Sequence, residues 1–336
     1  MHESWKSPVL RRVLCGLLAV LAAPLPSGAA PFELWILDQS SAPADDLWRF
    51  DSFSGFLDPF AGTDFVDPRD VVVGPDGRLW LLDGAPGSDE DVWSYDFGIG
   101  MWEALTGSSF IDPRALVFGS DGKLWILDND PDPTLDEIWS YDFGTLLYET
   151  LPASNFLDPR DFTFGPAGML WIFDSDADPS LDDVWSFDFT ILNYTTLSGS
   201  NFSDPRALSF DPLGRLWFVD SILDPTFDDV WALNFSSNLY VTLPSSNFVD
   251  PRDLRFDFAG NLWVLDGTPG ATDDVWTYDD ITNSYSTLVG SNFIDPRAFV
   301  FRIPPDRVPL VPAPGVAVLS GLLLVCGLAL LRRAAG

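Results

Sequence analysis

The stretch "GSNFIDPRAFVF" (residues 290–301) decides the fold, because its motifs recur along the whole chain and here they stop partway through a unit. Leu-Trp recurs every 45 or 46 residues, at Trp35, Trp80, Trp125, Trp171, Trp217 and Trp263. A second tryptophan follows each of these, at Trp48, Trp93, Trp139, Trp185, Trp231 and Trp276. Asp-Pro-Arg recurs with Arg69, Arg114, Arg160, Arg206, Arg252 and Arg297. A fixed period of this length indicates a repeat architecture.

One complete unit, residues 158–197, can be divided into four expected strands. "RDFTF" (160–164) alternates apolar residues on one face, "MLWIFD" (169–174) is apolar on both, and "VWSFDF" (184–189) and "YTTL" (194–197) follow. Glycine and proline turns separate these runs, and the runs are rich in aromatic and β-branched residues. The unit therefore predicts one four-stranded blade of a β-propeller, with strands A to D from the channel outward.

The two ends of the array complete each other. The first unit begins at Leu34 with a strand B, and the last ends at Phe301 with a strand A. Strands B, C and D within residues 34–60 therefore need the C-terminal strand as their inner neighbour. The sequence predicts an all-β, six-bladed β-propeller over 31–301, closed by C-terminal strand A pairing with N-terminal strands B, C and D, which removes the free edges.

The segments outside the array have the composition of export and anchoring signals. Residues 1–29 combine a basic start, an apolar run and small residues, as in a secretory signal peptide. Residues 302–314 form a proline-rich linker, 315–331 form an uncharged run long enough for a short transmembrane helix, and 332–336 are a basic tail. We expect an exported bacterial protein of the cell envelope or cell surface, without disulfides because the exported body has no cysteine.

This C-terminal segment resembles the PEP-CTERM sorting signals of exopolysaccharide-producing Gram-negative bacteria. Pro312-Ala313-Pro314 corresponds to the short motif, followed by the apolar helix and by Arg332 and Arg333. The resemblance implies recognition by an exosortase-type peptidase, although Ala313 stands where the family has glutamate. A plain single-span anchor is the other interpretation.

The charge balance restricts the possible partners. Lys and Arg number 18 against 50 Asp and Glu, which gives a formal net charge of -32. A field of this sign repels phosphate backbones, so nucleic acid is excluded as a partner. Cations, basic proteins and neutral polymers such as glycans are compatible with it.

In an antiparallel meander the D–A turns and the B–C loops lie on one face of the disc. Two of the B–C loops, 128–137 and 174–183, alternate carboxylates with short residues, a pattern that suits the oxygen ligands of Ca²⁺. The candidate calcium ligands are Asp128, Asp130, Asp132, Asp136, Asp174, Asp176, Asp178 and Asp182. The alternative is that these aspartates cap turns and pair with the repeated arginines.

Two further sets of charges recur near the channel. The six Asp-Pro-Arg arginines form either internal ion pairs between blades, which we favour, or a clamp for ligand carboxylates. The next residue is acidic in alternate blades, at Asp70, Asp161 and Asp253. These three carboxylates could hold one cation at the channel mouth, or they could record the duplication of a two-blade ancestor.

The aromatic residues divide into two expected groups. The repeated tryptophans lie within strands and are predicted to fill the space between blades. The "SNF" motifs at 154–156, 200–202, 246–248 and 291–293 precede Asp-Pro-Arg turns. We expect them to be more exposed and to offer a polar and aromatic contact to a glycan.

The pattern "DPRxxxFxPxGxLWxxD" resembles the NHL and streptogramin-lyase-like propeller families. The lyases of that group use a histidine and a divalent metal, whereas the only histidine here, His2, lies in the predicted signal peptide. Nearly identical blades suit a scaffold or multivalent binder better than one asymmetric catalytic site. We expect a non-catalytic binding or scaffolding module with a polymer, glycan or protein partner; the alternative is a metal-dependent hydrolase or lyase with its site in the channel.

Overall fold

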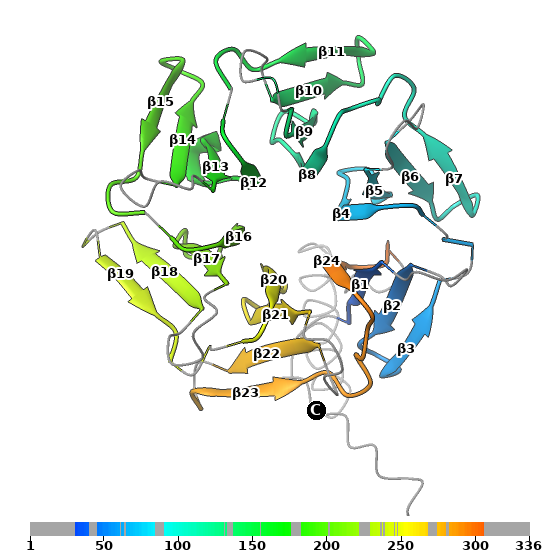
Figure 1. Cartoon of the computed structure of the whole chain (residues 1–336). Coiled ribbons are helices and arrows are strands. Elements are labelled where there is room, and N and C mark those ends of the chain that lie inside the picture. Colours follow the sequence, from blue (N-terminus) through cyan, green and yellow to red (C-terminus); the bar gives the residue numbers. More distant parts are fainter. Residues whose placement is uncertain are drawn as a thin grey trace, which may run out of the picture.

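The computed structural model describes residues 31–305 except for 40–45, 61, 64, 85–90, 131, 133–136, 155, 176–182, 201, 222–228, 236, 238, 245, 247, 268–273 and 280–281. The described residues form six four-stranded antiparallel sheets, arranged as blades around a central axis (Figure 1). The predicted six-bladed propeller is confirmed. Blades 1 to 5 follow the chain from residue 68 onward, and blade 6 combines the last strand with the first three.

Each blade has the same order of strands from the axis to the rim. Strands A are β4 (Pro68–Val73), β8 (Pro113–Phe118), β12 (Pro159–Phe164), β16 (Pro205–Phe210), β20 (Pro251–Phe256) and β24 (Pro296–Arg302). Strands B are β5 (Leu79–Asp83), β9 (Leu124–Asp128), β13 (Leu170–Asp174), β17 (Leu216–Asp220), β21 (Leu262–Asp266) and β1 (Glu33–Asp38).

The two outer strands are shorter and lie farther from the axis. Strands C are β6 (Val92–Asp96), β10 (Ile138–Asp142), β14 (Val184–Asp188), β18 (Val230–Asn234), β22 (Val275–Asp279) and β2 (Leu47–Asp51). Strands D are β7 (Met101–Ala104), β11 (Leu147–Thr150), β15 (Asn193–Thr196), β19 (Leu239–Thr242), β23 (Ser284–Thr287) and β3 (Phe56–Pro59). One 3₁₀ turn, η1 (Pro166–Gly168), joins β12 to β13. The observed strands lie within a residue or two of the predicted ranges.

The ring closes between the two ends of the propeller. Strand β24 pairs with β1 in antiparallel register, with Phe301 opposite Leu34 and Phe299 opposite Ile36. Figure 1 shows the C-terminal orange strand beside the N-terminal blue ones. The missing part of the last unit is therefore supplied by β1, β2 and β3.

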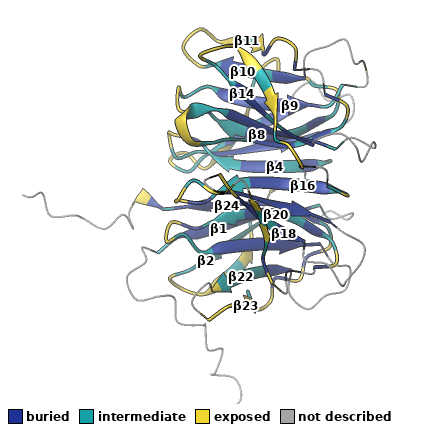
Figure 2. Cartoon of the chain, turned by 90° about the vertical axis from the view of Figure 1, so that its left-hand side faces the viewer, coloured by how far each residue is buried: buried dark blue, intermediate teal, exposed yellow. Residues whose placement is uncertain are grey.

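The core lies between blades and is densest around strands B. These strands are buried along their whole length, as expected for apolar strands between neighbouring sheets (Figure 2). Their tryptophans pack edge-on against phenylalanines of the next blade; the ring centroids of Trp80 and Phe118 are 5.7 Å apart. The predicted burial is confirmed for these tryptophans, whereas the tryptophans of strands C are only half-buried.

The start of each strand A carries an irregularity that positions the repeated arginine. In blade 1, Pro68 lies opposite Asp83 and Asp70 opposite Leu82, so Arg69 is the extra residue of a β-bulge. The same register shift occurs in the other blades described by these pairings. The bulge takes each arginine out of the strand ladder and leaves its side chain at the D–A face of the disc.

The predicted signal peptide, transmembrane helix and basic tail lie outside the described residues, as does the linker beyond Pro305. Across the part of the chain that the structure describes, none of the helical segments has the length and apolar character needed to cross a bilayer.

Candidate functional site

The Asp-Pro-Arg arginines form ion pairs with the aspartate two residues earlier. The nitrogen–oxygen distances are 2.5 Å for Arg69–Asp67, Arg114–Asp112, Arg160–Asp158, Arg206–Asp204 and Arg252–Asp250, and 2.6 Å for Arg297–Asp295. The partner of each arginine is thus in its own turn and not in the neighbouring acidic loop. All six guanidinium groups are partly accessible, so the D–A face carries a ring of half-exposed charge pairs.

Some of these charges also connect neighbouring blades, and the residue after strand B determines how. Where this residue is glycine, as at Gly84, the arginine passes beside it, and Arg69 reaches Asp112 of the next blade at 3.3 Å. Arg252 reaches Asp295 at 3.5 Å in the same way beside Gly267. A Cβ atom at Gly84 would lie 3.2 Å from Nε of Arg69, so the arginine would have to shift by a few tenths of an ångström to admit a side chain there.

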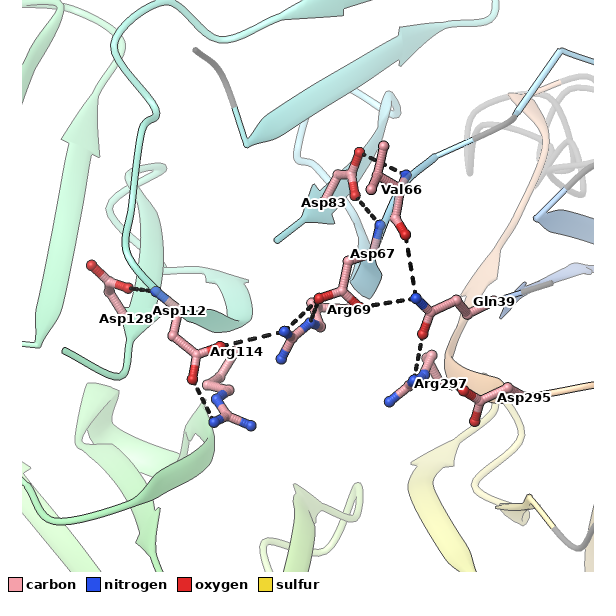
Figure 3. Close-up of polar contacts among 10 residues, drawn as sticks. All are labelled: Gln39, Val66, Asp67, Arg69, Asp83, Asp112, Arg114, Asp128, Asp295 and Arg297. Carbon is pink, nitrogen blue, oxygen red and sulfur yellow. Dashed lines mark hydrogen bonds and ion pairs between the residues drawn. The ribbon is translucent and has the colours of Figure 1, made fainter. Parts of the chain in front are cut away.

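At two other interfaces an amide side chain makes the connection instead. Gln39 donates to Asp67 of blade 1 at 3.1 Å and accepts from Arg297, which joins the closing blade to the first one (Figure 3). Asn129 donates to Asp158 at 3.3 Å. The ring of charge pairs is therefore a continuous structural element across several blades.

The aspartate that ends each strand B fixes the backbone of the D–A turn. Its carboxylate accepts hydrogen bonds from the N–H groups of the two residues before the proline; Asp83, for example, accepts from Val66 at 3.2 Å and from Asp67 at 2.7 Å. The equivalent acceptors are Asp38, Asp128, Asp174, Asp220 and Asp266. This is a capping role of the kind that short acidic side chains commonly take in turns.

Two predicted calcium ligands belong to this set. Asp128 accepts from Ile111 and Asp112, and burial raises the pKa of its carboxyl above the ordinary value while these N–H groups oppose the change. Asp174 accepts from Leu157 and Asp158. Within the described ranges, no group of three or more His, Cys, Asp or Glu side chains is arranged to hold a metal ion.

The remaining predicted calcium ligands are placed only in part. Asp130 accepts a hydrogen bond from the N–H of Asp132 at 2.9 Å, so these two follow the end of β9 as a tight turn. Asp136, Asp176, Asp178 and Asp182 lie outside the described residues. Calcium binding by these two loops stays a prediction.

A set of exposed aliphatic side chains surrounds the channel mouth on the D–A face. The residue immediately before each Asp-Pro-Arg is Val66, Ile111, Leu157, Ser203, Val249 and Ile294. The five aliphatic members, which we call the aliphatic crown, are between 59 and 68 % exposed. Their backbone N–H groups are the ones held by the aspartates that end strands B, so these side chains project from a fixed backbone.

The "SNF" motifs were expected to be exposed; that prediction is wrong for their serines and for three of their phenylalanines, which are buried, whereas Phe202 is partly buried and Asn292 is exposed. Ser154, Ser200, Ser246 and Ser291 are 0 % exposed, and Phe156, Phe248 and Phe293 are buried. The serine hydroxyl accepts from the backbone at the start of strand C; that of Ser154 accepts from Glu137 and Ile138, each at 3.0 Å.

The backbone N–H of the phenylalanine in this motif is held by the acidic residue that precedes strand C, as Phe156 donates to Glu137 at 2.9 Å. The motif therefore joins one blade to the turn that leads into the next. Since the serine and the phenylalanine are enclosed, the repeated contact with a glycan that we expected there has no exposed aromatic ring to use.

The three channel aspartates connect blades in pairs. Each accepts one N–H from the next residue of its own strand and one from strand A of the next blade. The second set of bonds joins Asp70 to Leu116, Asp161 to Leu208, and Asp253 to Phe299. They link blade 1 to 2, blade 3 to 4 and blade 5 to 6, a pairing that agrees with duplication of a two-blade unit.

A positive charge lies among these carboxylates, and it belongs to the protein. Arg255 Nε lies 3.4 Å from Asp253, and its Nη2 lies 3.9 Å from Asp70. Burial raises the pKa of Asp70 and of Asp161 to about 7, and it raises that of Asp253 as well; Arg255 acts against all three shifts. Burial disfavours the charge of Arg255, but the three carboxylates raise its pKa above the ordinary value.

The repeated motifs did not predict Arg255, because among the six strands A only β20 carries an arginine at this position. The other strands A carry Val72, Val117, Thr163, Ser209 and Val300 at this position. One blade therefore departs from the repeat, and it does so inside the channel, between the three acidic positions.

Comparison with known proteins shows the fold only. The chain matches no model of a protein family, and no curated protein sequence matches it. Among solved structures, a chain in the crystal structure of a nidogen/laminin complex is similar, with a TM-score of 0.62 and 14% sequence identity. The match covers 81% of this chain and 98% of that chain. At this identity the likeness shows a shared propeller architecture.

Proposed function

We propose that this protein is a non-catalytic binding or scaffolding module that is exported, anchored at the bacterial cell envelope, and binds a protein partner through its D–A face. The aliphatic crown carries the proposal. Exposed apolar side chains that recur around one face of a protein mark a candidate site of protein–protein contact. The Asp-Pro-Arg ion pairs supply charged groups beside these side chains on the same face.

The geometry of the crown supports binding with little loss of entropy. The backbone of Val66 and Asp67 is held by Asp83, and the backbone of Ile111 and Asp112 is held by Asp128. Side chains presented on a fixed backbone lose less conformational freedom on association, and this preorganisation increases affinity. The D–A face is thus built as a rigid surface.

The kind of residue favours a protein partner over a glycan. The crown is aliphatic, whereas carbohydrate recognition relies on aromatic rings that stack on sugar faces. The exposed phenylalanines of the described chain, such as Phe53, Phe143 and Phe258, follow strands A or C at the opposite face. The solved structure reported above comes from a complex of two proteins, which is in keeping with this choice.

Calcium is a subsidiary part of the proposal. The acidic segments 128–137 and 174–183 are B–C loops, which are expected on the same face of the disc as the crown. An ion bound by these loops would therefore order that face. Because Asp128 and Asp174 already cap the D–A turns, the carboxylates proposed to bind it are those that follow them, beginning with Asp130 and Asp132.

We do not propose the metal-dependent hydrolase or lyase that we considered as an alternative. Such a site would need carboxylates open to a metal ion in the channel. Asp70, Asp161 and Asp253 each accept two backbone hydrogen bonds, and the guanidinium of Arg255 lies between them.

The test compares two sets of substitutions that add equal charge to opposite faces. The crown variant carries Ile111→Asp, Leu157→Asp and Ile294→Asp, and the control carries Ile99→Asp, Ile191→Asp and Leu213→Asp, whose side chains are as exposed. The purified proteins are immobilised and exposed to envelope and extracellular proteins of the producing cell, and bound proteins are cross-linked and identified.

We expect wild type and control to retain the same protein, with cross-links next to the crown, and the crown variant to lose at least about tenfold in affinity. Retention of that protein by the crown variant would contradict the proposal. A partner that is lost after digestion of glycans, with the crown variant unaffected, would instead point to carbohydrate.

A further inference from the structure

The face opposite the crown contains a cavity that the repeat does not explain. Its volume is about 860 Å³, and it opens beside the A–B and C–D turns of blade 1. Valines of three strands A form one wall, Val72 of β4, Val117 of β8 and Val300 of β24, and phenylalanines such as Phe118 and Phe258 form another. A concave, mostly apolar site of this size is typical of small-molecule binding.

The cavity arises where blade 1 departs from the repeat. The sixth residue of strand A is phenylalanine in the other five blades, and three of these rings stack on the phenylalanine that follows strand C, as in Phe118–Phe143 at 6.2 Å. Blade 1 has Val73 at that position. The place above Phe97 is taken by the guanidinium of Arg302, 3.5 Å from the ring centroid, and Val73, Phe97 and Arg302 all line the cavity.

Arg255 supplies the polar end of this cavity. Its side chain is 21 % exposed, it lines the cavity, and its two ion pairs are long, at 3.4 and 3.9 Å. Among the described residues it makes no hydrogen bond. By contrast, Arg302 donates to Glu33 at 2.8 Å, and Arg78 lies 2.9 Å from Asp96. Arg255 is therefore the guanidinium whose N–H donors are available to a ligand.

The residues that line the cavity include more basic than acidic side chains, unlike the protein as a whole. Three arginines, Arg78, Arg255 and Arg302, face two aspartates, Asp76 and Asp96, on a chain of net charge -32. Arg78 is paired with Asp96 and Arg302 with Glu33, whereas the pairs of Arg255 are long, so the guanidinium of Arg255 is the positive group that an anion would meet here.

We propose that this cavity binds a small amphipathic monocarboxylate, with its carboxylate on Arg255 and its hydrocarbon body against the valines and phenylalanines of blades 1, 2, 5 and 6. The guanidinium is a planar fork that matches a carboxylate. A dianion such as phosphate is disfavoured, because Asp70, Asp161 and Asp253 lie behind Arg255 and would repel a second charge. The site is independent of the D–A face.

Binding of a carboxylate here is coupled to proton uptake. The titratable groups that face Arg255 are Asp70 on β4, Asp161 on β12 and Asp253 on β20; the inner strands between them carry Ala115, Ala207 and Ala298. A ligand carboxylate competes with the aspartates for the guanidinium and adds a like charge. Both effects favour the protonated aspartates, so affinity rises as the pH falls towards 6.

The test uses decanoate, decanol and decylammonium as probes on the full chain, with isothermal titration calorimetry in two buffers of different ionisation enthalpy. Arg255→Val places in blade 5 the residue found in blades 1, 2 and 6. Val73→Phe restores the phenylalanine of the other five blades and fills the cavity. Arg49→Val, outside the cavity, is the control for loss of one positive charge. Thermal unfolding confirms that each variant is folded.

Decanoate is expected to bind at least about tenfold more tightly than decanol, with proton uptake, and decylammonium is expected not to bind. Arg255→Val should remove the preference for decanoate and leave decanol binding unchanged, Val73→Phe should weaken both, and Arg49→Val should change neither. Equal binding of decanoate and decanol, unchanged decanoate affinity in Arg255→Val, or no proton uptake would overturn the assignment of Arg255. No binding of decanoate would overturn the site itself.

Discussion

The guanidinium of Arg302 lies 3.5 Å from the ring centroid of Phe97, where other blades stack a second phenylalanine. The same group donates to Glu33 at 2.8 Å and to the carbonyl of Gly77 at 3.3 Å. One side chain of the last strand therefore contacts the first strand, the A–B turn of blade 1 and the ring of Phe97. Arg302 and Glu33 are both buried, so this ion pair is largely shielded from water.

The first prediction concerns this buried ion pair. Arg302→Met should lower the free energy of unfolding by about 3 to 5 kcal/mol, because it leaves the buried Glu33 carboxylate with the distant Arg49, 3.8 Å away, as its only cationic partner in the described chain, beside the indole N–H of Trp35 at 3.2 Å. Urea denaturation measures the change. Arg49→Met, which removes an arginine that is 40% exposed, should cost about 0 to 1 kcal/mol.

A double substitution distinguishes pairing from simple packing. Glu33→Met with Arg302→Met removes both charges, so the protein should regain part of the stability lost in Arg302→Met. Strictly additive losses would show that the two side chains act independently.

The second prediction concerns the dependence of stability on pH. Burial raises the pKa of Asp70 and Asp161 to about 7, from 3.8 in the unfolded chain, so the folded state binds more protons than the unfolded state between these values. Stability conferred by these groups should be highest below about pH 4 and should fall as the pH rises towards 7. This direction is opposite to that of a carboxylate in an ordinary salt bridge.

The general repulsion among acidic groups also lowers stability as the pH rises, so single substitutions are needed to isolate the channel. Asp161→Asn should make the decline between pH 4 and 8 less steep in chemical denaturation. Asp188→Asn is the matched control, because Asp188 is exposed and hydrogen bonds from Thr190 lower its pKa. An identical slope in wild type and Asp161→Asn would show that Asp161 titrates normally.

The third prediction concerns the buried serines of the "SNF" motifs. Ser154→Ala removes the hydroxyl that accepts from the backbone N–H groups of Glu137 and Ile138, and among the described residues only that of Glu137 has a second acceptor, the Ser154 carbonyl at 3.1 Å. Leaving the Ile138 donor unsatisfied should cost about 1 to 3 kcal/mol in urea denaturation. Ser120→Ala, at an exposed position of an A–B turn, should change stability by less than about 0.5 kcal/mol, and equal effects would contradict the role assigned to Ser154.

The fourth prediction concerns calcium. If the proposed loop sites exist, Ca²⁺ at a hundredfold excess over its dissociation constant should stabilise the fold by about 2.7 kcal/mol relative to EDTA. Asp130→Asn together with Asp132→Asn should reduce this gain, and Mg²⁺ should not reproduce it. The same melting temperature in EDTA and in millimolar Ca²⁺ would refute the calcium proposal and leave the aliphatic crown unaffected.

The sequence was sufficient for the fold because the relevant signals are local and repeated. Leu-Trp and Asp-Pro-Arg mark a strand and a turn, and the incomplete first and last units predict the closure between Leu34 and Phe301. The role of Asp83 and its equivalents was not predictable in the same way. Their hydrogen bonds to turns 16 or 17 residues away depend on how the strands curve, so a calcium loop and a capping aspartate look alike in the sequence.

The cavity on the A–B face could not be predicted from the repeated motifs, because the residues that distinguish it do not repeat. Arg255 and Val73 are single departures from the blade pattern, and each becomes informative only when the six units are aligned. Even then, the sequence does not show that Arg255 lies among three aspartates of different blades. The "SNF" motifs were predicted to be exposed because serine and asparagine are small and polar. The serine is instead buried, and its hydroxyl accepts hydrogen bonds from buried backbone N–H groups.

The pairing of β24 with β1 determines which blade of the propeller can be completed last during synthesis. Strand β1 emerges first during synthesis, but its inner neighbour emerges about 260 residues later, as the hydrogen bonds between Asp38 and the turn at Ile294 show. Until then the N-terminal part of blade 6, strands β1 to β3, lacks its inner neighbour and presents an unpaired strand edge, the kind of surface that promotes aggregation. Five blades can therefore form as their strands emerge, whereas the sixth is necessarily the last to be completed.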